Sequence, residues 1–259
     1  MKTKVFLILA LFLSSSAFSD EHSEKNAKVF GKLGYGFISV LHHNSQWGKE
    51  GTDFSYVDNG GQNVLLPTWR AEAGLTLNKN HKMSFVYQPI FVTAEVTLKE
   101  DLKVDDLTFE KGKNLTATYD FPFYRFSYWY LLANSKHIDF WVGGGIQIRN
   151  ANIRFKQDAG TVSFRQGNIG PVPLLNLAAD FRANDSFSVY LAGTGFWAPI
   201  KYINGSNTDI NGWIYEFEVE PTLTIKEDLK TFFNFRVLGG GSSGTSKTVR
   251  QSGGQFSSD

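Results

Sequence analysis

Three carboxylates alternate with apolar residues in one segment of this chain of 259 residues. Within 212–226, Glu216, Glu218 and Glu220 occupy every second position, and their neighbours are aromatic or aliphatic. Successive side chains of a β-strand point to opposite sides. The segment would therefore carry carboxylates on one side and an apolar band on the other. A row of carboxylates along a polar passage selects cations, which is the first chemistry that this spacing suggests.

The same alternation places further charged residues on the side away from the apolar bands. In addition to Lys32, the expected inward set comprises Arg70, Glu72, Arg125, Asp139, Arg149, Asp180, Arg182, Glu216, Glu218, Glu220 and Arg236. Isolated buried charges cost several kcal/mol each unless they are paired or hydrated. One interpretation is an ion-pair network that fills a lumen. The other is a narrow, gated polar pathway in which the glutamate ladder selects cations.

A second group of residues invites a catalytic interpretation. His42, His43 and Ser45 lie where a strand should meet a loop, and a lipid hydrolase needs a nucleophile, a base and an orienting group. Adjacent residues of a strand point in opposite directions, so at most one histidine can face a given site. The same geometry argues against a metal site. We therefore expect polar loop residues here, with no enzyme activity, no metal and no cofactor.

Short alternating runs separated by polar turns predict the elements that must position these residues. We expect nine strands, at 28–42, 64–78, 81–97, 115–133, 137–155, 170–182, 186–199, 212–226 and 229–239. Tight turns such as Asn78-Lys79-Asn80-His81 alternate with longer connections at 43–63, 98–114, 156–169 and 200–211. Short turns at one end and long loops at the other are typical of an outer-membrane barrel.

The first nineteen residues predict export. Lys2 and Lys4 precede an apolar run from Val5 to Leu13, and small residues lead to Ser19. This pattern describes a cleavable signal peptide at 1–19, cut before Asp20. The chain contains no cysteine, and its formal net charge of +1 argues against a general nucleic-acid surface. We expect residues 20–259 to form one barrel domain in the bacterial outer membrane.

The predicted fold is all-β: an antiparallel up-and-down transmembrane β-barrel of about eight to ten strands. A soluble lipocalin-like barrel is the alternative, but it would need an apolar lumen. Nine strands do not satisfy the even number that single-chain bacterial barrels use. The Gly-rich stretch after Leu238 contains one aromatic residue, Phe256. We expect that the closing strand is missing through C-terminal truncation; an eight-stranded barrel is the fallback.

Several segments resemble a functionally uncharacterised group of bacterial outer-membrane β-barrel proteins. They are KVDDLTFEKGKNLTATYDF (103–121), FPFYRFSYWYLL (121–132), WVGGGIQIRNANIRF (141–155), GPVPLL (170–175) and FRVLGGG (235–241). The resemblance covers most of residues 20–259. It implies a barrel of about ten strands with an aromatic closing strand after the Gly-rich loop. It implies no catalytic residue.

These observations predict a non-enzymatic barrel with a structural or surface-interaction role. The loops at 43–63, 98–114 and 156–169 would form its contact surface. The expected partners are outer-membrane lipids and the machinery that assembles barrels, together with an extracellular ligand that the sequence does not name. A narrow pore for small solutes or ions is the alternative, and an outer-leaflet lipid-modifying enzyme is the third hypothesis.

Overall fold

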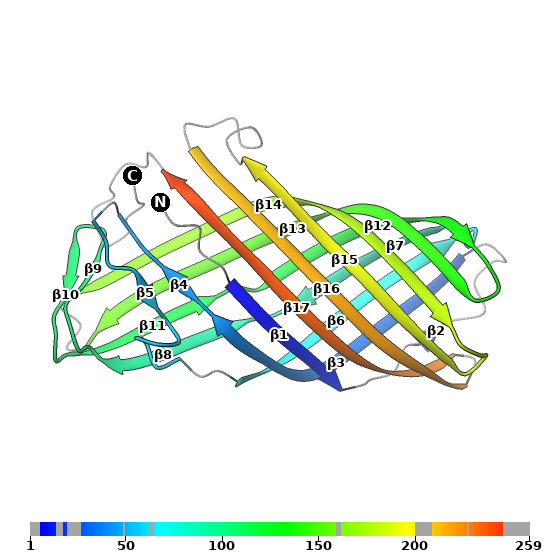
Figure 1. The fold of residues 1–259 in the computed structure, drawn as a ribbon, viewed down its shortest axis with the longest axis horizontal. Coiled ribbons are helices and arrows are strands. Elements are labelled where there is room, and N and C mark those ends of the chain that lie inside the picture. The colour runs from blue at the N-terminus through cyan, green and yellow to red at the C-terminus, as the bar shows by residue number, and fades with distance from the viewer. Residues whose placement is uncertain are drawn as a thin grey trace.

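Every regular element of the computed structural model is a β-strand (Figure 1). The model describes the backbone of residues 6–13, 18–19, 27–48, 50–62, 65–158, 162–199, 209–226 and 228–245. Within these ranges no helix is long and apolar enough to cross a membrane. The strands are β1 Phe6–Leu13, β2 Phe18–Ser19, β3 Ala27–His42, β4 Asn44–Ser45, β5 Phe54–Ser55, β6 Leu65–Leu77, β7 His81–Gln88, β8 Phe91–Thr97, β9 Leu102–Val104, β10 Leu107–Phe109, β11 Asn114–Asp120, β12 Phe123–Asn134, β13 Ile138–Gln157, β14 Ser163–Arg182, β15 Phe187–Pro199, β16 Asp209–Lys226 and β17 Leu229–Thr245.

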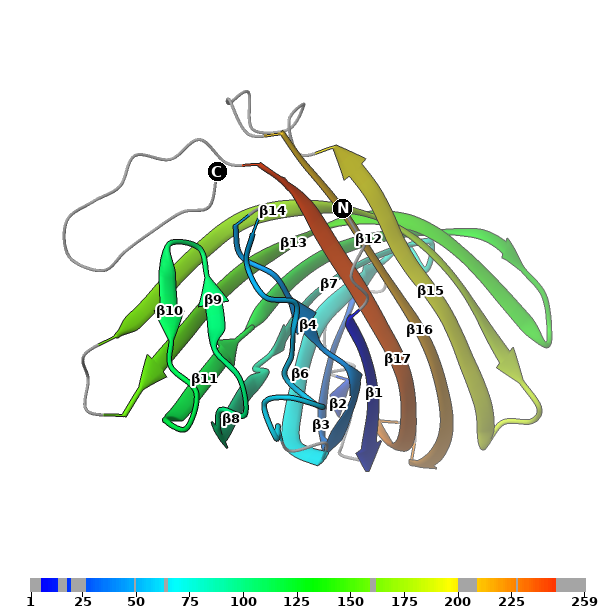
Figure 2. The same cartoon turned by 60° about the vertical axis from the view of Figure 1, so that its left-hand side comes forward.

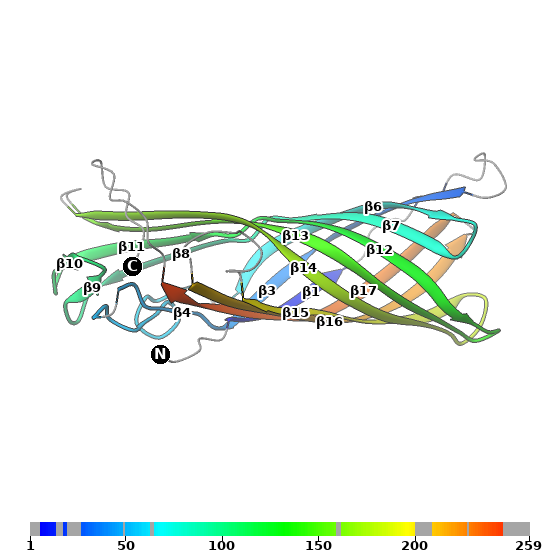
Figure 3. The same ribbon diagram turned by 90° about the horizontal axis from the view of Figure 1, so that it is seen from above.

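Ten of these strands form a closed antiparallel ring. Its order is β12-β7-β6-β3-β1-β17-β16-β15-β14-β13, and β13 pairs in turn with β12. The strands run obliquely, so those of opposite walls cross when the barrel is seen from above (Figure 3). The prediction of an antiparallel up-and-down barrel is confirmed. Because every ring strand has a neighbour on both sides, the ring has no free edge along its paired length.

The tenth ring strand comes from a segment that the sequence assigns to the export signal. β1 pairs antiparallel with β3 on one side and with β17 on the other, and Figure 1 shows it between them. The expected gap in the ring is therefore filled here by residues 6–13. Cleavage before Asp20 stays a prediction, and residue 20 lies outside the described ranges.

The barrel wall is apolar outside and polar inside, as the alternation predicts. Phe217 is 61% exposed and Leu175 is 65% exposed, whereas Glu216 is 3% exposed and Arg236 is 2% exposed. A soluble domain distributes these residue types in the opposite way. The outward bands of 64–78, 115–133, 137–155 and 212–226 are those that the sequence predicts.

Two predicted strands are interrupted by proline. Residues 81–97 form β7 and β8 with a break at Pro89, and residues 115–133 form β11 and β12 with a break at Pro122. Proline has no backbone N–H and cannot donate to the ladder, so both hairpin arms break at the same level. Below the breaks, β7 and β12 belong to the ring. Above them, β8 pairs with β11, and β11 pairs with β13.

The same sheet thus extends beyond the barrel at the end away from the tight turns, and we call this extension the distal sheet. It consists of β8, β11, residues 151–157 of β13 and residues 163–168 of β14. The connection predicted at 156–169 is in fact mostly strand, since β13 and β14 stay paired up to Lys156 and Ser163. The small hairpins β4–β5 and β9–β10 lie on this side of the molecule (Figure 2).

Candidate functional site

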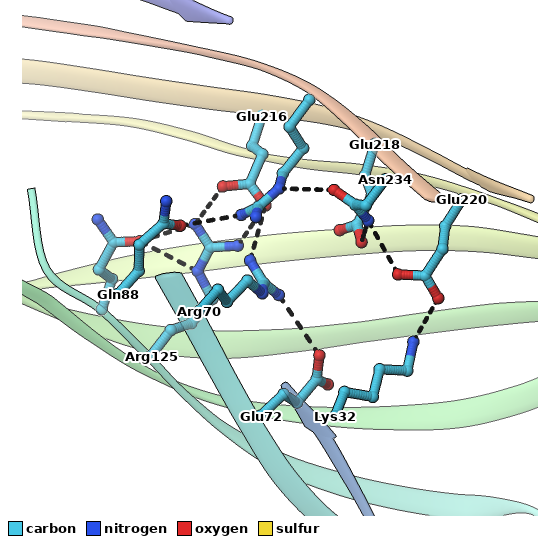
Figure 4. Close-up of polar contacts among 11 residues, drawn as sticks. Lys32, Arg70, Glu72, Gln88, Arg125, Glu216, Glu218, Glu220 and Asn234 are labelled. Atoms are coloured by element: carbon cyan, nitrogen blue, oxygen red, sulfur yellow. Dashed lines mark hydrogen bonds and ion pairs between the residues drawn. The ribbon is translucent and has the colours of Figure 1, made fainter. Parts of the chain in front are cut away.

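The lumen contains a network of ion pairs around one carboxylate, that of Glu216 on β16 (Figure 4). Arg125 on β12 donates from Nη1 and Nη2 to the two carboxylate oxygens, at 2.9 and 3.0 Å. The Nη1 atoms of Arg236 on β17 and Arg70 on β6 lie 3.6 and 3.9 Å from Oε1. Bidentate pairs between arginine and carboxylate are among the stronger charged hydrogen bonds. One carboxylate therefore faces guanidinium groups from three other strands.

The other two glutamates of the ladder are also engaged. The Asn234 Nδ2 group donates to Glu218 Oε1 at 2.6 Å and to Glu220 Oε2 at 2.9 Å. Lys32 Nζ donates to the second oxygen of Glu220 at 2.6 Å. Because each carboxylate has a protein partner, the three do not form the free ladder that a cation pathway would use.

Two buried glutamines supply acceptors to the guanidinium groups of Arg125 and Arg236. Gln147 Oε1 accepts from Arg125 Nε and Nη2 at 3.0 and 2.8 Å. Gln88 Oε1 accepts from Arg236 Nη1 at 3.2 Å. These neutral amide oxygens accept hydrogen bonds from the guanidinium N–H groups without adding charge to the lumen.

These side chains form what we call the central charge network. Its members are Lys32, Arg70, Glu72, Gln88, Arg125, Gln147, Glu216, Glu218, Glu220, Asn234 and Arg236. Its four basic and four acidic residues balance in formal charge. The cavity beside Lys32, Arg70 and Glu220 measures about 10 Å³, close to the minimum that holds one water molecule. Side chains thus fill the lumen at this level.

An apolar layer lies above the central charge network, toward the distal sheet. We call this layer the apolar cap. It consists of Ile38, Val40, Val86, Ile90, Val92, Phe121, Phe123, Ala151 and Leu238, all at most 9% exposed. Removing apolar surface from water stabilises such a layer by about 25 cal/mol per Å². The cap separates the charges from the distal end of the molecule.

Three of the predicted lumen residues lie apart from the network. Asp139 and Arg182 pair with each other beside the tight turn before β13. Asp180 is part-buried, and its Oδ1 atom has no hydrogen-bond partner among the described residues. A fourth residue, Arg149, belongs to β13, but its side chain lies outside the described part of the chain. The described members of the predicted set therefore divide into a central group, the pair of Asp139 and Arg182 at the turn, and Asp180.

Sequence reasoning missed one charged residue in the lumen. Lys82 on β7 places its Nζ atom 5.1, 5.0 and 5.3 Å from the ring centres of Trp129, Trp141 and Tyr190. Cation–π contacts of this kind stabilise a desolvated ammonium group. Ser84 is buried, and Lys82 lies two positions before it on β7, so alternation of side chains predicts that Lys82 also points inward.

The residues of the catalytic hypothesis do not assemble into a triad. His42 is exposed, whereas His43 is buried and stacked on Tyr56, with 3.8 Å between the ring centroids. The Nδ1 atom of His43 is hydrogen-bonded to Gln62 Oε1 at 2.8 Å. Ser45 accepts a hydrogen bond from the indole of Trp47 instead. In this geometry His43 anchors the loop between β3 and β6.

This anchor predicts that acid loosens the loop. Burial lowers the pKa of His43 to about 4, below the ordinary value of about 6.5. An opened loop therefore binds the proton more tightly, so closure is favoured above pH 6.5 and is lost as the pH falls toward 4. We expect loop opening, measured by amide hydrogen exchange of residues 54–62, to increase on the order of 25-fold between pH 7.5 and pH 5.0.

Matched variants test the assignment to His43. His43→Gln should abolish this pH dependence whatever its effect at pH 7.5, and His42→Gln should keep it, because His42 is exposed. An equal pH response in His43→Gln and in the unchanged protein would show that another group is responsible.

Comparisons with known proteins complete the description of the site. No protein-family model matches the chain, and no relative is found among the curated proteins.

Solved structures that match over most of its length are outer-membrane barrels of low identity. The attachment invasion locus protein Ail of Yersinia pestis is 8% identical, over 94% of this chain and 100% of Ail, with a TM-score of 0.32. The toluene transporter TbuX of Ralstonia pickettii is 11% identical, over 92% of this chain and 68% of TbuX, with a TM-score of 0.36. The toluene transporter TodX of Pseudomonas putida is 7% identical, over 92% and 89%, with a TM-score of 0.33. Scores of this size carry no conclusion about function.

Proposed function

We propose that this protein is a non-enzymatic barrel of the bacterial outer membrane, closed to solutes, which presents its distal end to the exterior. The observation that carries the proposal is the distribution of residue types. Large apolar side chains are exposed around the ring, and a balanced set of charges is buried within it. Lipid outside and a polar interior account for both features.

The proposed role is structural or one of surface interaction. Among the side chains that the structure describes, the central charge network and the apolar cap leave no row of free carboxylates along the lumen, which disfavours the ion pathway. Membrane lipids are the proposed partners of the outward face, and barrel-assembly machinery would insert the exported chain. The distal sheet, together with the hairpins β4–β5 and β9–β10, is the proposed contact surface.

Fractionation of cells that express the chain tests the location. We expect the protein in the outer-membrane fraction, with a gel migration that shifts on heating, as closed barrels show. Recovery in the soluble fraction without detergent would refute the membrane assignment.

Planar bilayers test the closed lumen separately. We expect no single-channel openings at any applied voltage, because a conducting path would have to separate Glu216 from Arg125 and displace the apolar cap. The variant Glu216→Ala serves as a comparison, since it removes the central carboxylate and leaves the apolar cap in place. Regular openings of the unchanged protein would favour the pore instead.

A further inference from the structure

Three basic side chains form a cluster on the outward face of the distal sheet. Arg154 of β13 lies directly opposite Arg165 of β14, and Lys156 follows two positions after Arg154. Phe155 and Phe164, which alternate with these residues, are 0% and 1% exposed and point inward. All three basic side chains are exposed and stand on one face. We call them the basic face.

The two arginines of the basic face repel each other, although Glu95 and Asp120 stand on the same outward face of the neighbouring strands β8 and β11. Like charges directly opposite each other on neighbouring strands are destabilising. No described residue forms an ion pair with any of the three; Arg165 donates only to the amide oxygen of Asn152, at 3.2 Å. An anion between the two arginines would convert this repulsion into two attractive contacts.

Hydroxyl groups surround the same position. The strand register places Thr118 opposite Arg154, Thr116 opposite Lys156, and Ser163 opposite Lys156 on the other side. Guanidinium, ammonium and hydroxyl groups are the donors that proteins use for phosphate oxygens. The basic face therefore offers charge and neutral donors within one flat area of three strands.

The cluster stands on a rigid support. Beneath it, the inward face of the distal sheet packs in an apolar core that includes Phe54, Leu115, Phe155 and Phe164. Strands held by such a core keep their side chains in fixed positions, which lowers the entropic cost of binding.

The height of the basic face above the last exposed apolar residue of its own strand indicates the kind of anion. On β13 the last exposed apolar residue is Ile148, six positions before Arg154. At about 3.3 Å per residue and a strand tilt of about 40°, Arg154 lies about 15 Å above Ile148 along the membrane normal. The headgroup layer of a phospholipid bilayer is only about 5–7 Å thick on each side. A glycolipid with a saccharide headgroup reaches higher.

We propose that the basic face binds phosphate groups on the saccharide headgroup of outer-leaflet glycolipids. This inference rests on the proposed membrane location. The partner is membrane-bound, because the basic face continues, on the same side of the same strands, the band that faces lipid. The ligand would fix the distal sheet against the membrane surface.

Native mass spectrometry of the detergent-purified full chain tests the proposal. The probes are rough lipopolysaccharide, which carries phosphorylated core sugars, the same lipid after dephosphorylation, phosphatidylglycerol, and inositol hexakisphosphate as a soluble polyanion. We expect rough lipopolysaccharide to bind, and the triple variant R154Q/K156Q/R165Q to bind it roughly 100-fold more weakly, since each basic residue near an anionic surface contributes about fivefold. Binding should fall by a similar factor on dephosphorylation.

The triple variant K99Q/K111Q/K113Q is the matched control. It removes the same charge from exposed positions on the connections that flank β9 and β10 and should bind as the unchanged protein does. The single variant R165Q should fold at least as well as the unchanged protein because it relieves the repulsion.

Equal binding by the two triple variants would overturn the proposal, as would equal binding of phosphatidylglycerol and rough lipopolysaccharide. Tighter binding of inositol hexakisphosphate than of rough lipopolysaccharide would assign the face to a soluble polyanion instead. A soluble, non-membrane chain would refute the proposed location, whatever these binding results.

Discussion

Glu216→Ala is expected to destabilise the barrel by about 3–5 kcal/mol, the cost of leaving a buried charge without its partner. The carboxylate is 3% exposed and faces the guanidinium groups of Arg70, Arg125 and Arg236. Its removal leaves a net positive charge in a network that is otherwise balanced. Water reaches this level with difficulty, because the adjacent cavity measures about 10 Å³. The barrel can respond only by hydrating the arginines or by opening.

Because Glu216 lies at the centre of the network, removing it should destabilise the barrel more than removing one of its arginine partners. Arg125→Ala should cost less than Glu216→Ala, because Arg236 and Arg70 remain near the carboxylate when Arg125 is lost. The measurement is the free energy of unfolding in denaturant, in phospholipid vesicles, with the unfolded fraction read from gel migration. Glu95→Ala, on the exposed face of β8, serves as the control. Equal destabilisation by Glu216→Ala and Glu95→Ala would contradict the proposed network.

The sequence predicts the barrel wall well because period-two alternation is a local property. The band on 212–226 places Glu216 inside and Phe217 outside, and the exposure of both residues agrees. The two breaks are harder to predict. Pro89 and Pro122 are visible in the sequence, but they act together only because β7–β8 and β11–β12 form one long hairpin. That pairing follows from the register of the sheet.

The partners within the lumen are less predictable than its lining. Arg125 reaches Glu216 across the barrel, 91 positions along the chain. Which inward residues meet depends on the tilt of the strands and on their stagger around the ring, which no single segment reveals. The buried acceptors Gln88 and Gln147 were missed because a search by charge passes over neutral amides. Lys82, by contrast, is predictable from alternation alone, because it lies two positions from the buried Ser84 on β7.

The sequence and the structure of residues 6–13 indicate different roles for this segment. Their pattern is that of a removable signal, yet they pair with β3 and β17 over the length of β1. A strand bonded on both edges cannot be removed without exposing two edges to lipid, where unsatisfied backbone groups are costly. The register sets Ala10 opposite Arg236. In a chain cleaved before Asp20, another strand antiparallel to both neighbours would have to take this position.

Val219→Arg is expected to destabilise the barrel by about 2–4 kcal/mol, the cost of a basic residue at the bilayer midplane. Val219 is the midpoint of the outward apolar run from Trp213 to Ile225 on β16, and it is 42% exposed. In a soluble protein an arginine at so exposed a position would be nearly neutral, because water would solvate the guanidinium group. The sign and size of this effect therefore report directly on the solvent around the barrel.

Thr93→Arg supplies the matched control, since Thr93 is exposed on the outward face of β8, in the distal sheet beyond the break at Pro89. Both variants would be unfolded in denaturant from phospholipid vesicles. Val219→Arg should lower the free energy of unfolding, and Thr93→Arg should leave it within about 0.5 kcal/mol of the unchanged protein. If the two substitutions behaved alike, hydrocarbon would not surround β16. The buried charges of the lumen would then need an explanation other than a barrel turned outward toward lipid.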